Sequence, residues 1–439
     1  MHMINAYDPA NAGELGDADR ELIRRREQLL GPAYRLFYAR PLHLVRGDGV
    51  WLYDADGVAY LDVYNNVASL GHCHPRVVEA IARQAALLNT HTRYLHETVL
   101  ALAERLLATM PAALGHVMFT CTGSEANDLA LRIARAATGG TGVIVTKLAY
   151  HGVTSAVAEF SPSLGDGVAT GRDVRLVPAP DGYRGDPAVG PAFARGVMAA
   201  LEEFRAAGIR PAMLILDSIF SSDGVHADPP GFLQAAVDAV RAAGALYVAD
   251  EVQAGFGRTG AAMWGFLRHG VQPDMVSMGK PMGNGHPVAG LALRPELVRD
   301  FGARARYFNT FGGNPVSAAA AMAVLDALEA EGIQDRAAAV GAYLVAGLRR
   351  LAAAHEAIGD VRGAGLFIGV DLVTDRQSRA PDRDLATRVV NGLRERRVLI
   401  SASGPGGNVL KIRPPLAFTR DNADLFLATL ADTLTACQA

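Results

Sequence analysis

Lysine is scarce in this chain of 439 residues. Of the 42 basic side chains, only Lys147, Lys280 and Lys411 are lysines, so arginine supplies nearly all of the positive charge. An arginine cannot form an imine, whereas a lysine amine can. Each of the three lysines is therefore a candidate for chemistry that needs an amine.

Cysteine is equally rare, and long apolar runs are missing. The chain has Cys73, Cys121 and Cys437, an odd number without the spacing of a disulfide framework or a metal site. The first 22 residues are polar and acidic, and no run of about 18 apolar residues occurs. We therefore expect a protein of the reducing cytoplasm, with neither export nor membrane insertion.

Positive charge is not in excess either. The 42 basic residues face 45 acidic ones for a net charge of -3, and no basic stripe occurs. Nucleic acids and anionic membrane surfaces are thus unsupported as partners, and small molecules are favoured. Half of the residues are hydrophobic and a fifth are charged, with scattered Gly and Pro, which indicates a globular chain rather than a fibrous or disordered one.

Seven short apolar or β-branched runs alternate with Ala-rich helical stretches between about residues 115 and 330. This alternation predicts an α/β fold with a mainly parallel sheet. The expected strands cover residues 116–120, 142–146, 174–177, 212–217, 245–250, 274–279 and 290–294.

The two ends of the chain predict a smaller α+β domain. Residues 45–63 are typical of a hairpin with a turn at 54–57, and helical patterns alternate with apolar runs after residue 330. We predict an N-terminal segment at 1–64 that contributes to the small domain, a large domain at 65–330, and a C-terminal small domain at 331–439.

Asp250 and Lys280 each follow an expected strand, and ligands bind at the carboxyl edge of an open α/β sheet. Pyridoxal phosphate needs an amine that holds it as an imine and a carboxylate that keeps its ring nitrogen protonated. The pair therefore indicates a pyridoxal phosphate site. The alternative is a helix-capping acid and a solvated loop lysine, so further residues are required.

The segment CTGSEAND follows the first strand, so Gly123 and Ser124 open a helix whose N–H groups can hold a phosphate. An ordinary helix start from Ser124 to Asn127 is the alternative. Thr310, in FNTFGGNP, is a second candidate phosphate donor, and a plain turn is its alternative.

Tyr150 and Gln253 complete this set. Tyr150 follows a strand and can stack on a planar ring, unless it is simply packed. Gln253 lies three residues after Asp250 and can donate a hydrogen bond to a ring hydroxyl. The cluster at residues 72–74 (His-Cys-His) suggests zinc, but it lacks a fourth ligand and a paired motif, so we expect no metal.

Eight segments in order, among them FTCTGSEANDLALRIAR, YVADEVQAGFGRTG, MVSMGKPMGNGHPVAG and NVLKIRPPL, resemble the class III aminotransferases of fold type I. Within that family the chain is most similar to the branch of alanine-glyoxylate aminotransferase 2-like proteins and of the ethanolamine-phosphate and phosphohydroxylysine phospho-lyases. The resemblance covers nearly the whole chain. It implies a large pyridoxal phosphate domain and a homodimer with shared active sites.

The resemblance also implies roles for individual residues. Lys280 corresponds to the Schiff-base lysine, with Asp250 at the ring nitrogen and Gln253 near the ring oxygen. It places Tyr150 on the ring with His151 beside it, Gly123 and Ser124 on the phosphate, and Thr310 on the phosphate of the neighbouring subunit. Substrate-side candidates are Tyr38, Asn65, Asn66 and Arg413, with Arg413 as an anion clamp.

Two departures bear on the reaction. Asp217 stands where family members usually carry a glutamate, and Gly407 stands where the eukaryotic phospho-lyases carry a basic residue. Because of Gly407 we favour transamination between an amine or amino acid and a keto acid or aldehyde. Elimination of phosphate from an O-phosphorylated amino alcohol is the alternative, and a non-catalytic binding protein with the same fold is a second one.

Overall fold

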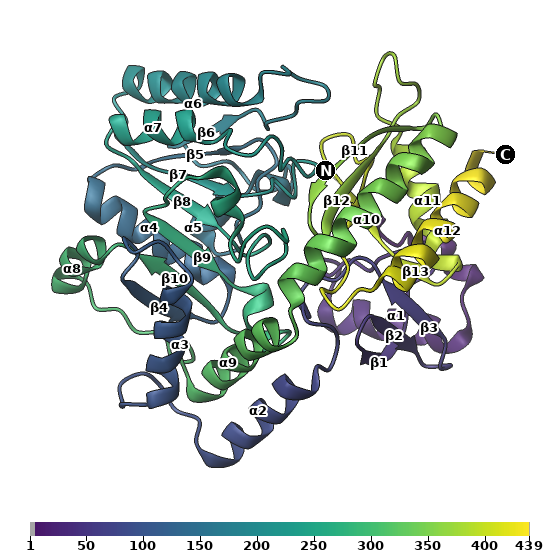
Figure 1. Cartoon of the computed structure of the whole chain (residues 1–439), viewed down its shortest axis with the longest axis horizontal. Helices are drawn as coiled ribbons and strands as arrows, with labels where there is room; N and C mark the ends of the chain where they lie inside the picture. Colours follow the sequence, from purple (N-terminus) through teal and green to yellow (C-terminus); the bar gives the residue numbers. More distant parts are fainter. Residues whose placement is uncertain (1–4, 439) are drawn as a thin grey trace.

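A seven-stranded sheet organises the larger lobe of the protein (Figure 1). The structure is a computed structural model and describes residues 5–438. The strand order is β4-β10-β9-β8-β7-β5-β6, in which β10 runs antiparallel to β4 and β9 and the other pairs are parallel. The prediction of a mainly parallel sheet of seven strands is confirmed. The strands are β4 (His116–Thr120), β5 (Gly142–Thr146), β6 (Val174–Val177), β7 (Pro211–Asp217), β8 (Leu246–Asp250), β9 (Met275–Met278) and β10 (Ala289–Leu293).

Helices cover both faces of this sheet, which is why its strands are apolar throughout. On β7, Met213 and Ile215 join a cluster with α4 (Gly123–Thr138), while Leu214 and Leu216 join the cluster of α6 (Val189–Ala206) and α7 (Gln234–Ala242). This alternation with period two buries both faces of the strand. The cluster on the α4 face also includes Phe301 of α8 (Pro295–Arg304).

The smaller lobe combines both ends of the chain. One of its sheets has the order β1-β2-β3-β13, in which β3 (Ala59–Asp62) pairs in parallel with β13 (Val398–Leu399). The other has the order β11-β12-β15-β14, formed by β11 (Ile358–Ala364), β12 (Phe367–Leu372), β14 (Ser401–Ser403) and β15 (Val409–Ile412). Helices α10 (Ile333–Ala354), α11 (Arg383–Glu395) and α12 (Arg420–Gln438) pack with these sheets. The expected small α+β domain is thus present, and the boundaries at 64/65 and 330/331 stay a prediction.

The expected hairpin at residues 45–63 has three strands instead of two. β1 (Leu44–Asp48) and β2 (Trp51–Asp54) pair through the tight turn at Gly49 and Val50, and β2 then pairs with β3. Gly49 has a φ of 55°, a conformation that glycine adopts without steric cost. The single run VRGDGVWLYD therefore contains a turn, for which its Asp48-Gly49 pair is a signal that the prediction of two strands did not use.

The remaining elements link the lobes or cover the large sheet. Helices α2 and α9 pack against each other below the large sheet in the view of Figure 1, and α9 continues to α10. These elements are η1 (Pro9–Glu14), α1 (Asp17–Leu30), α2 (Pro75–Leu87), α3 (Glu97–Ala108), α5 (Ser155–Ala158), η2 (Pro162–Leu164), η3 (Gly265–His269), η4 (Lys280–Gly283) and α9 (Pro315–Ala330).

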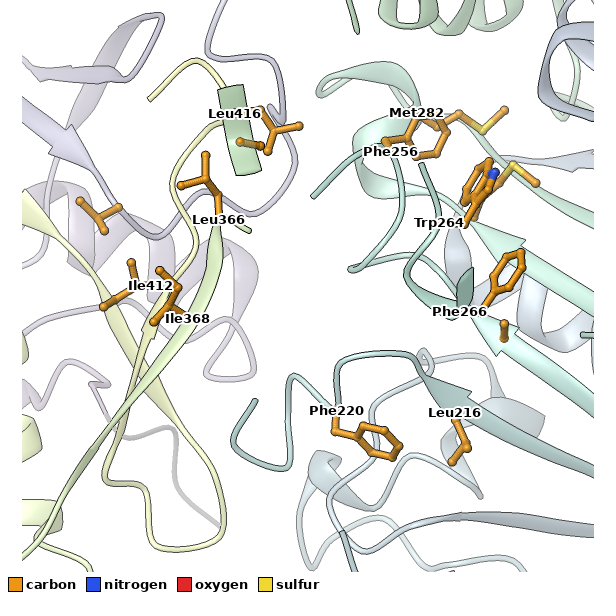
Figure 2. Close-up of a cluster of buried hydrophobic side chains, with 14 of the residues drawn as sticks. Leu216, Phe220, Phe256, Trp264, Phe266, Met282, Leu366, Ile368, Ile412 and Leu416 are labelled. Carbon is orange, nitrogen blue, oxygen red and sulfur yellow. The ribbon is translucent and has the colours of Figure 1, made fainter. Parts of the chain in front are cut away.

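The two lobes share one hydrophobic core. Figure 2 shows Leu366, Ile368, Ile412 and Leu416 of the small lobe opposite aromatic side chains of the large lobe, and all belong to a single buried cluster. Burial of apolar surface at this junction stabilises the position of the small lobe against the carboxyl edge of the sheet.

Helix α10 packs very closely against the β11–β12 turn of the small lobe. By length and composition it is the one helix of residues 5–438 that could cross a membrane, but its buried residues pack against β11 and α12. A Cβ atom at Gly341, in the middle of α10, would lie 2.2 Å from the carbonyl oxygen of Gly365 in the β11–β12 turn. Close approach of two backbones therefore requires glycine at position 341.

We expect Gly341→Ala to destabilise the protein by about 1–3 kcal/mol, because overpacking outweighs the higher helix propensity of alanine. Gly302 in α8 is the matched control, since a Cβ atom there meets nothing within 4 Å. Gly302→Ala should stabilise the protein by up to about 1 kcal/mol. Thermal unfolding of both variants checks the signs, and a stabilised Gly341→Ala would contradict the packing.

Candidate active site

The carboxyl edge of the large sheet brings the expected residues together. Asp217 at the end of β7 lies opposite Asp250 at the end of β8, and Asp250 lies opposite Ser277 of β9, which Lys280 follows by three residues. These strand ends border a cavity of about 300 Å³, named here the Lys280 cavity. Of the proposed cofactor residues, it is lined by Gly123, Ser124, Tyr150, His151, Asp250, Gln253 and Lys280.

Asp250 is buried and held by three donors. Asn127 Nδ2 donates to Asp250 Oδ2 at 2.9 Å, His151 Nδ1 lies 2.7 Å from the same oxygen, and the Val252 N–H donates to Oδ1 at 3.1 Å. His151 thus contacts the carboxylate as well as the cavity. Asn127 was missed as a functional residue, because its position in the first turn of α4 suggested only a helix start.

The start of α4 provides an anion cradle. Thr122 and Glu125 form a capping box, in which the Thr122 side chain accepts from the Glu125 N–H. The N–H groups of Gly123 and Ser124 have no acceptor among residues 5–438 and lie at the cavity. A Cβ atom at Gly123 would lie 2.8 Å from Val252, so glycine permits this close packing beside the cavity. Free N–H groups at a helix N-terminus favour a phosphate.

Lys280 is the first residue of η4, and its Nζ lies 5.8 Å from the centre of the Tyr150 ring. Burial, and after it the positive charge of Arg413, lower the pKa of the Lys280 ammonium to about 8, against the opposing effect of Asp250 and Asp217. A large fraction of Lys280 is therefore a neutral amine near pH 8, which is the form that acts as a nucleophile or base.

Tyr150 also lines a second cavity of about 650 Å³. It is named here the Lys411 cavity, and its wall includes Tyr64, Arg383, Gly407 and Lys411. The two cavities therefore meet at the Tyr150 side chain. Gly407 leaves its part of the wall without a side chain, as the sequence indicated.

Lys411 is a buried lysine without an acceptor. It lies on β15, and its Nζ is 5.5 Å from the centre of the Phe367 ring, with no side-chain hydrogen bond or ion pair within the described part of the chain. Burial lowers the pKa of Lys411 well below its usual value, and the charge of Arg413 contributes to the same effect. A buried ammonium is costly unless an anion compensates it, so this side chain favours an anionic ligand in the cavity.

Internal partners occupy the Arg413 guanidinium. Its Nε donates to the carbonyl oxygens of Tyr64 and Asn65, its Nη2 to Asn66 Oδ1 at 3.0 Å, and its Nη1 to Gln253 Oε1. Asn66 is thus a partner of Arg413. Neither residue borders the Lys280 cavity or the Lys411 cavity.

The side chains of Asn65 and Tyr38 likewise form hydrogen bonds within the protein. Asn65 Nδ2 donates to Asp62 Oδ2 and to the Ala68 carbonyl oxygen, so its amide shapes the loop after β3. The Tyr38 side chain is buried, and its hydroxyl donates to the Ile400 carbonyl oxygen at 3.0 Å. These positions give no support to direct substrate contacts, because internal partners already satisfy the polar groups.

Of the two remaining residues, Thr310 lies outside the Lys280 cavity and Asp217 lines it. Thr310 is exposed and does not line the Lys280 cavity of its own chain. Asp217 is at the cavity, and its two oxygens accept from the N–H groups of Ile219 and Ser221. Its carboxylate therefore shapes the turn after β7, and burial raises its pKa.

The residues of the Lys280 cavity fit pyridoxal phosphate. The cavity is lined by an amine, a buried carboxylate, an aromatic ring and the free N–H groups of a helix start. These are the groups that this cofactor needs. No cluster of three or more potential metal-ligating side chains occurs in residues 5–438. In the cluster at residues 72–74, His72 contacts Asp62 and His74 contacts Glu331.

Comparisons with known proteins identify the family. Residues 38–434 match the family model of aminotransferase class-III, and the chain belongs to this family, which implies pyridoxal phosphate as cofactor. The chain is 45% identical to a Drosophila melanogaster protein named alanine–glyoxylate aminotransferase 2-like, over 95% of this chain and 87% of that protein. It is 37% identical to the Caenorhabditis elegans ethanolamine-phosphate phospho-lyase homolog 1, over 94% of this chain and 93% of the other.

Solved structures agree with this family. The structure is similar to that of a phospholyase from Arthrobacter in complex with phosphoethanolamine, with a TM-score of 0.92 and 44% sequence identity. The match covers 94% of this chain and 99% of the other. The class-III aminotransferase fold, with a large mixed sheet and a smaller domain, is thereby confirmed.

We expect protein freed of cofactor to bind added pyridoxal phosphate at a rate that rises with pH and is half-maximal near pH 8. The neutral amine is the reactive form, and the pKa of Lys280 is about 8. The growth of the visible absorption band measures the rate. Lys280→Ala should stay without this band while Lys147→Ala develops it, and a rate independent of pH between 7 and 9 would contradict the lowered pKa.

Proposed function

We propose that the protein is a pyridoxal phosphate-dependent phospho-lyase, which eliminates phosphate and ammonia from an O-phosphorylated amino alcohol. One observation carries this proposal: the buried Lys411, which forms no ion pair within residues 5–438, lines a cavity that adjoins the Lys280 cavity at Tyr150. A small substrate spanning both cavities places its amino group near Lys280 and its phosphate near Lys411.

The proposed reaction consumes one water and yields an aldehyde, ammonia and inorganic phosphate. When bound, the cofactor withdraws electrons from the carbon that carries the substrate amino group. Lys280, as a neutral amine, takes the proton from that carbon. The bond between the neighbouring carbon and the phosphate oxygen then breaks, and the Lys411 ammonium stabilises the charge on the departing phosphate.

The relatives support this proposal without deciding it. One solved relative is a phospholyase in complex with phosphoethanolamine, and one curated relative is named a phospho-lyase homolog. Gly407 argued against phosphate binding because it lacks a basic side chain. Lys411 answers that objection, since it supplies a cation to the same cavity wall.

Transamination is the second candidate function. The relative with 45% identity is named as an aminotransferase 2-like protein, and the Lys280 cavity contains the groups that both reactions use. The two reactions differ in their need for an acceptor. Phosphate and aldehyde released from phosphoethanolamine without a keto acid indicate elimination, whereas conversion of an amine only with pyruvate present indicates transamination.

We expect Lys411→Met to lower kcat/KM for phosphoethanolamine by about 10- to 100-fold, because a charge-assisted hydrogen bond to the phosphate is lost. Phosphate release measures the rate, and the visible band of the cofactor should be unchanged. Since phosphate binding requires the charged form of a lysine whose pKa is lowered, KM should also rise with pH.

Lys147→Met is the matched control, because Lys147 is exposed and the variant loses the same charge. Equal rates for Lys411→Met and wild type would contradict the phosphate site. A wild type that is colourless after cofactor addition would instead support the non-catalytic binding protein.

We also propose a homodimer as the active form. Thr310 lies exposed outside the cavity of its own chain, where it can reach a second chain. The next residue, Phe311, is 68% exposed. Leu95 lines a surface cavity together with Asn309 and is 98% exposed. Large exposed apolar side chains of this kind favour a protein interface.

Leu95→Glu should therefore weaken the dimer, because a charge would be buried in the interface. Sedimentation velocity over a range of concentrations measures the effect. Leu425→Glu, on the exposed face of α12, is the control. A wild type that remains monomeric at all concentrations would exclude the dimer.

A further inference from the structure

Arg413 joins three separate segments behind Gln253, which lines the Lys280 cavity. It follows β15 of the small lobe, contacts residues 64–66 after β3, and reaches Gln253 after β8 of the large lobe. Its guanidinium lies 5.2 Å from the centre of the Tyr64 ring and 5.4 Å from that of Phe367. The side chain is 2% exposed, so these contacts fix it in one position.

All acceptors of the Arg413 guanidinium are neutral oxygens. They are the carbonyl oxygens of Tyr64 and Asn65 and the side-chain oxygens of Asn66 and Gln253, and the Arg413 group forms no ion pair within residues 5–438. A buried cation with neutral partners is expensive, and replacing it by an apolar side chain would often be less costly. A role for the guanidinium donors in orienting a neighbouring group explains why this position holds an arginine and not an apolar residue.

Gln253 is that neighbouring group. A guanidinium offers only donors, so it can bind the Gln253 amide only through its oxygen. With Oε1 held by Arg413, the Nε2 donor is the end that remains for the cavity, which Gln253 lines. Without this contact the amide can turn by half a rotation and present an acceptor instead.

We infer that Arg413 is a positioning residue, which fixes Gln253 so that the cavity receives a hydrogen-bond donor at this point. The ligand group opposite is then an oxygen with negative charge, such as the ring oxygen of pyridoxal phosphate. This inference rests on the proposed cofactor site, but not on whether the protein performs elimination or transamination. It replaces the expected role of Arg413 as an anion clamp.

The charge of Arg413 has a second effect that the experiment must separate. It lowers the pKa of Lys280, after the larger effect of burial. Arg413→Lys keeps a positive charge but loses the planar fork that reaches Asn66 and Gln253 together. A change in this variant therefore reports the lost orientation rather than the lost charge.

The pH at which the visible band of the bound cofactor changes is the measurement. A donor at the ring oxygen stabilises its negative charge and lowers the proton affinity of the coloured group. We expect Gln253→Ala to raise this midpoint by about one pH unit. Arg413→Lys should raise it by a similar amount, but should add nothing in the Gln253→Ala background.

Gln253→Glu provides a variant that retains the contact with Arg413 as an ion pair while it cannot donate to the cavity. Its midpoint should rise at least as far as that of Gln253→Ala. An unmoved midpoint in Arg413→Lys, with shifted midpoints in the Gln253 variants, would overturn the role of Arg413 alone. Unmoved midpoints in the Gln253 variants, with a normal wild-type band, would overturn the donor at Gln253 and the inference with it. Loss of the band from the wild type would overturn the cofactor site as well. An equal shift from Arg413→Lys with and without Gln253 would show that Arg413 does not act through Gln253.

Discussion

Asp217 and Asp250 lie opposite each other on neighbouring parallel strands, both at the carboxyl edge of the large sheet. Two ionised carboxylates at this spacing repel each other strongly where water is excluded. Asp250 is stabilised by Asn127 and His151, and Asp217 by the N–H groups of its own turn. The loops that surround the candidate active site are therefore built to satisfy these two side chains.

The small lobe adds two basic side chains whose pKa values respond to the charge of Asp217. Lys411 and Arg413 are two residues apart at the end of β15, so they leave the strand on the same side. Phe367 of β12 lies within 5.5 Å of both groups and limits their access to water. Because the lobes share one hydrophobic core, the fold itself determines where these cations lie relative to Lys280.

Local patterns predicted much of this arrangement. Strands buried on both faces stand out as short apolar runs, and Asp250 and Lys280 were recognisable because each follows such a run. The turn at Gly49 has a local signal in the Asp48-Gly49 pair, but the prediction placed the single turn of the hairpin at the stronger signal, residues 54–57. The partners of Tyr38 and Arg413 come from distant segments, so no local signal could show that internal bonds occupy these side chains. The rarity of lysine was the one signal that pointed to Lys411 as a functional residue. A role was assigned from the sequence to Lys280 alone.

The scarcity of lysine has a physical explanation at two of its three positions. An arginine remains charged even when it is buried, whereas a lysine can release its proton. Lys280 must be a neutral amine to react, and burial lowers its pKa to about 8. Lys411 can stay neutral in an empty cavity and become charged when an anion arrives. Arg413 needs no such change, because its proposed role is to keep Gln253 in one orientation. Lysine thus occupies the two positions where the side chain has to change its charge, and arginine occupies the position where it does not.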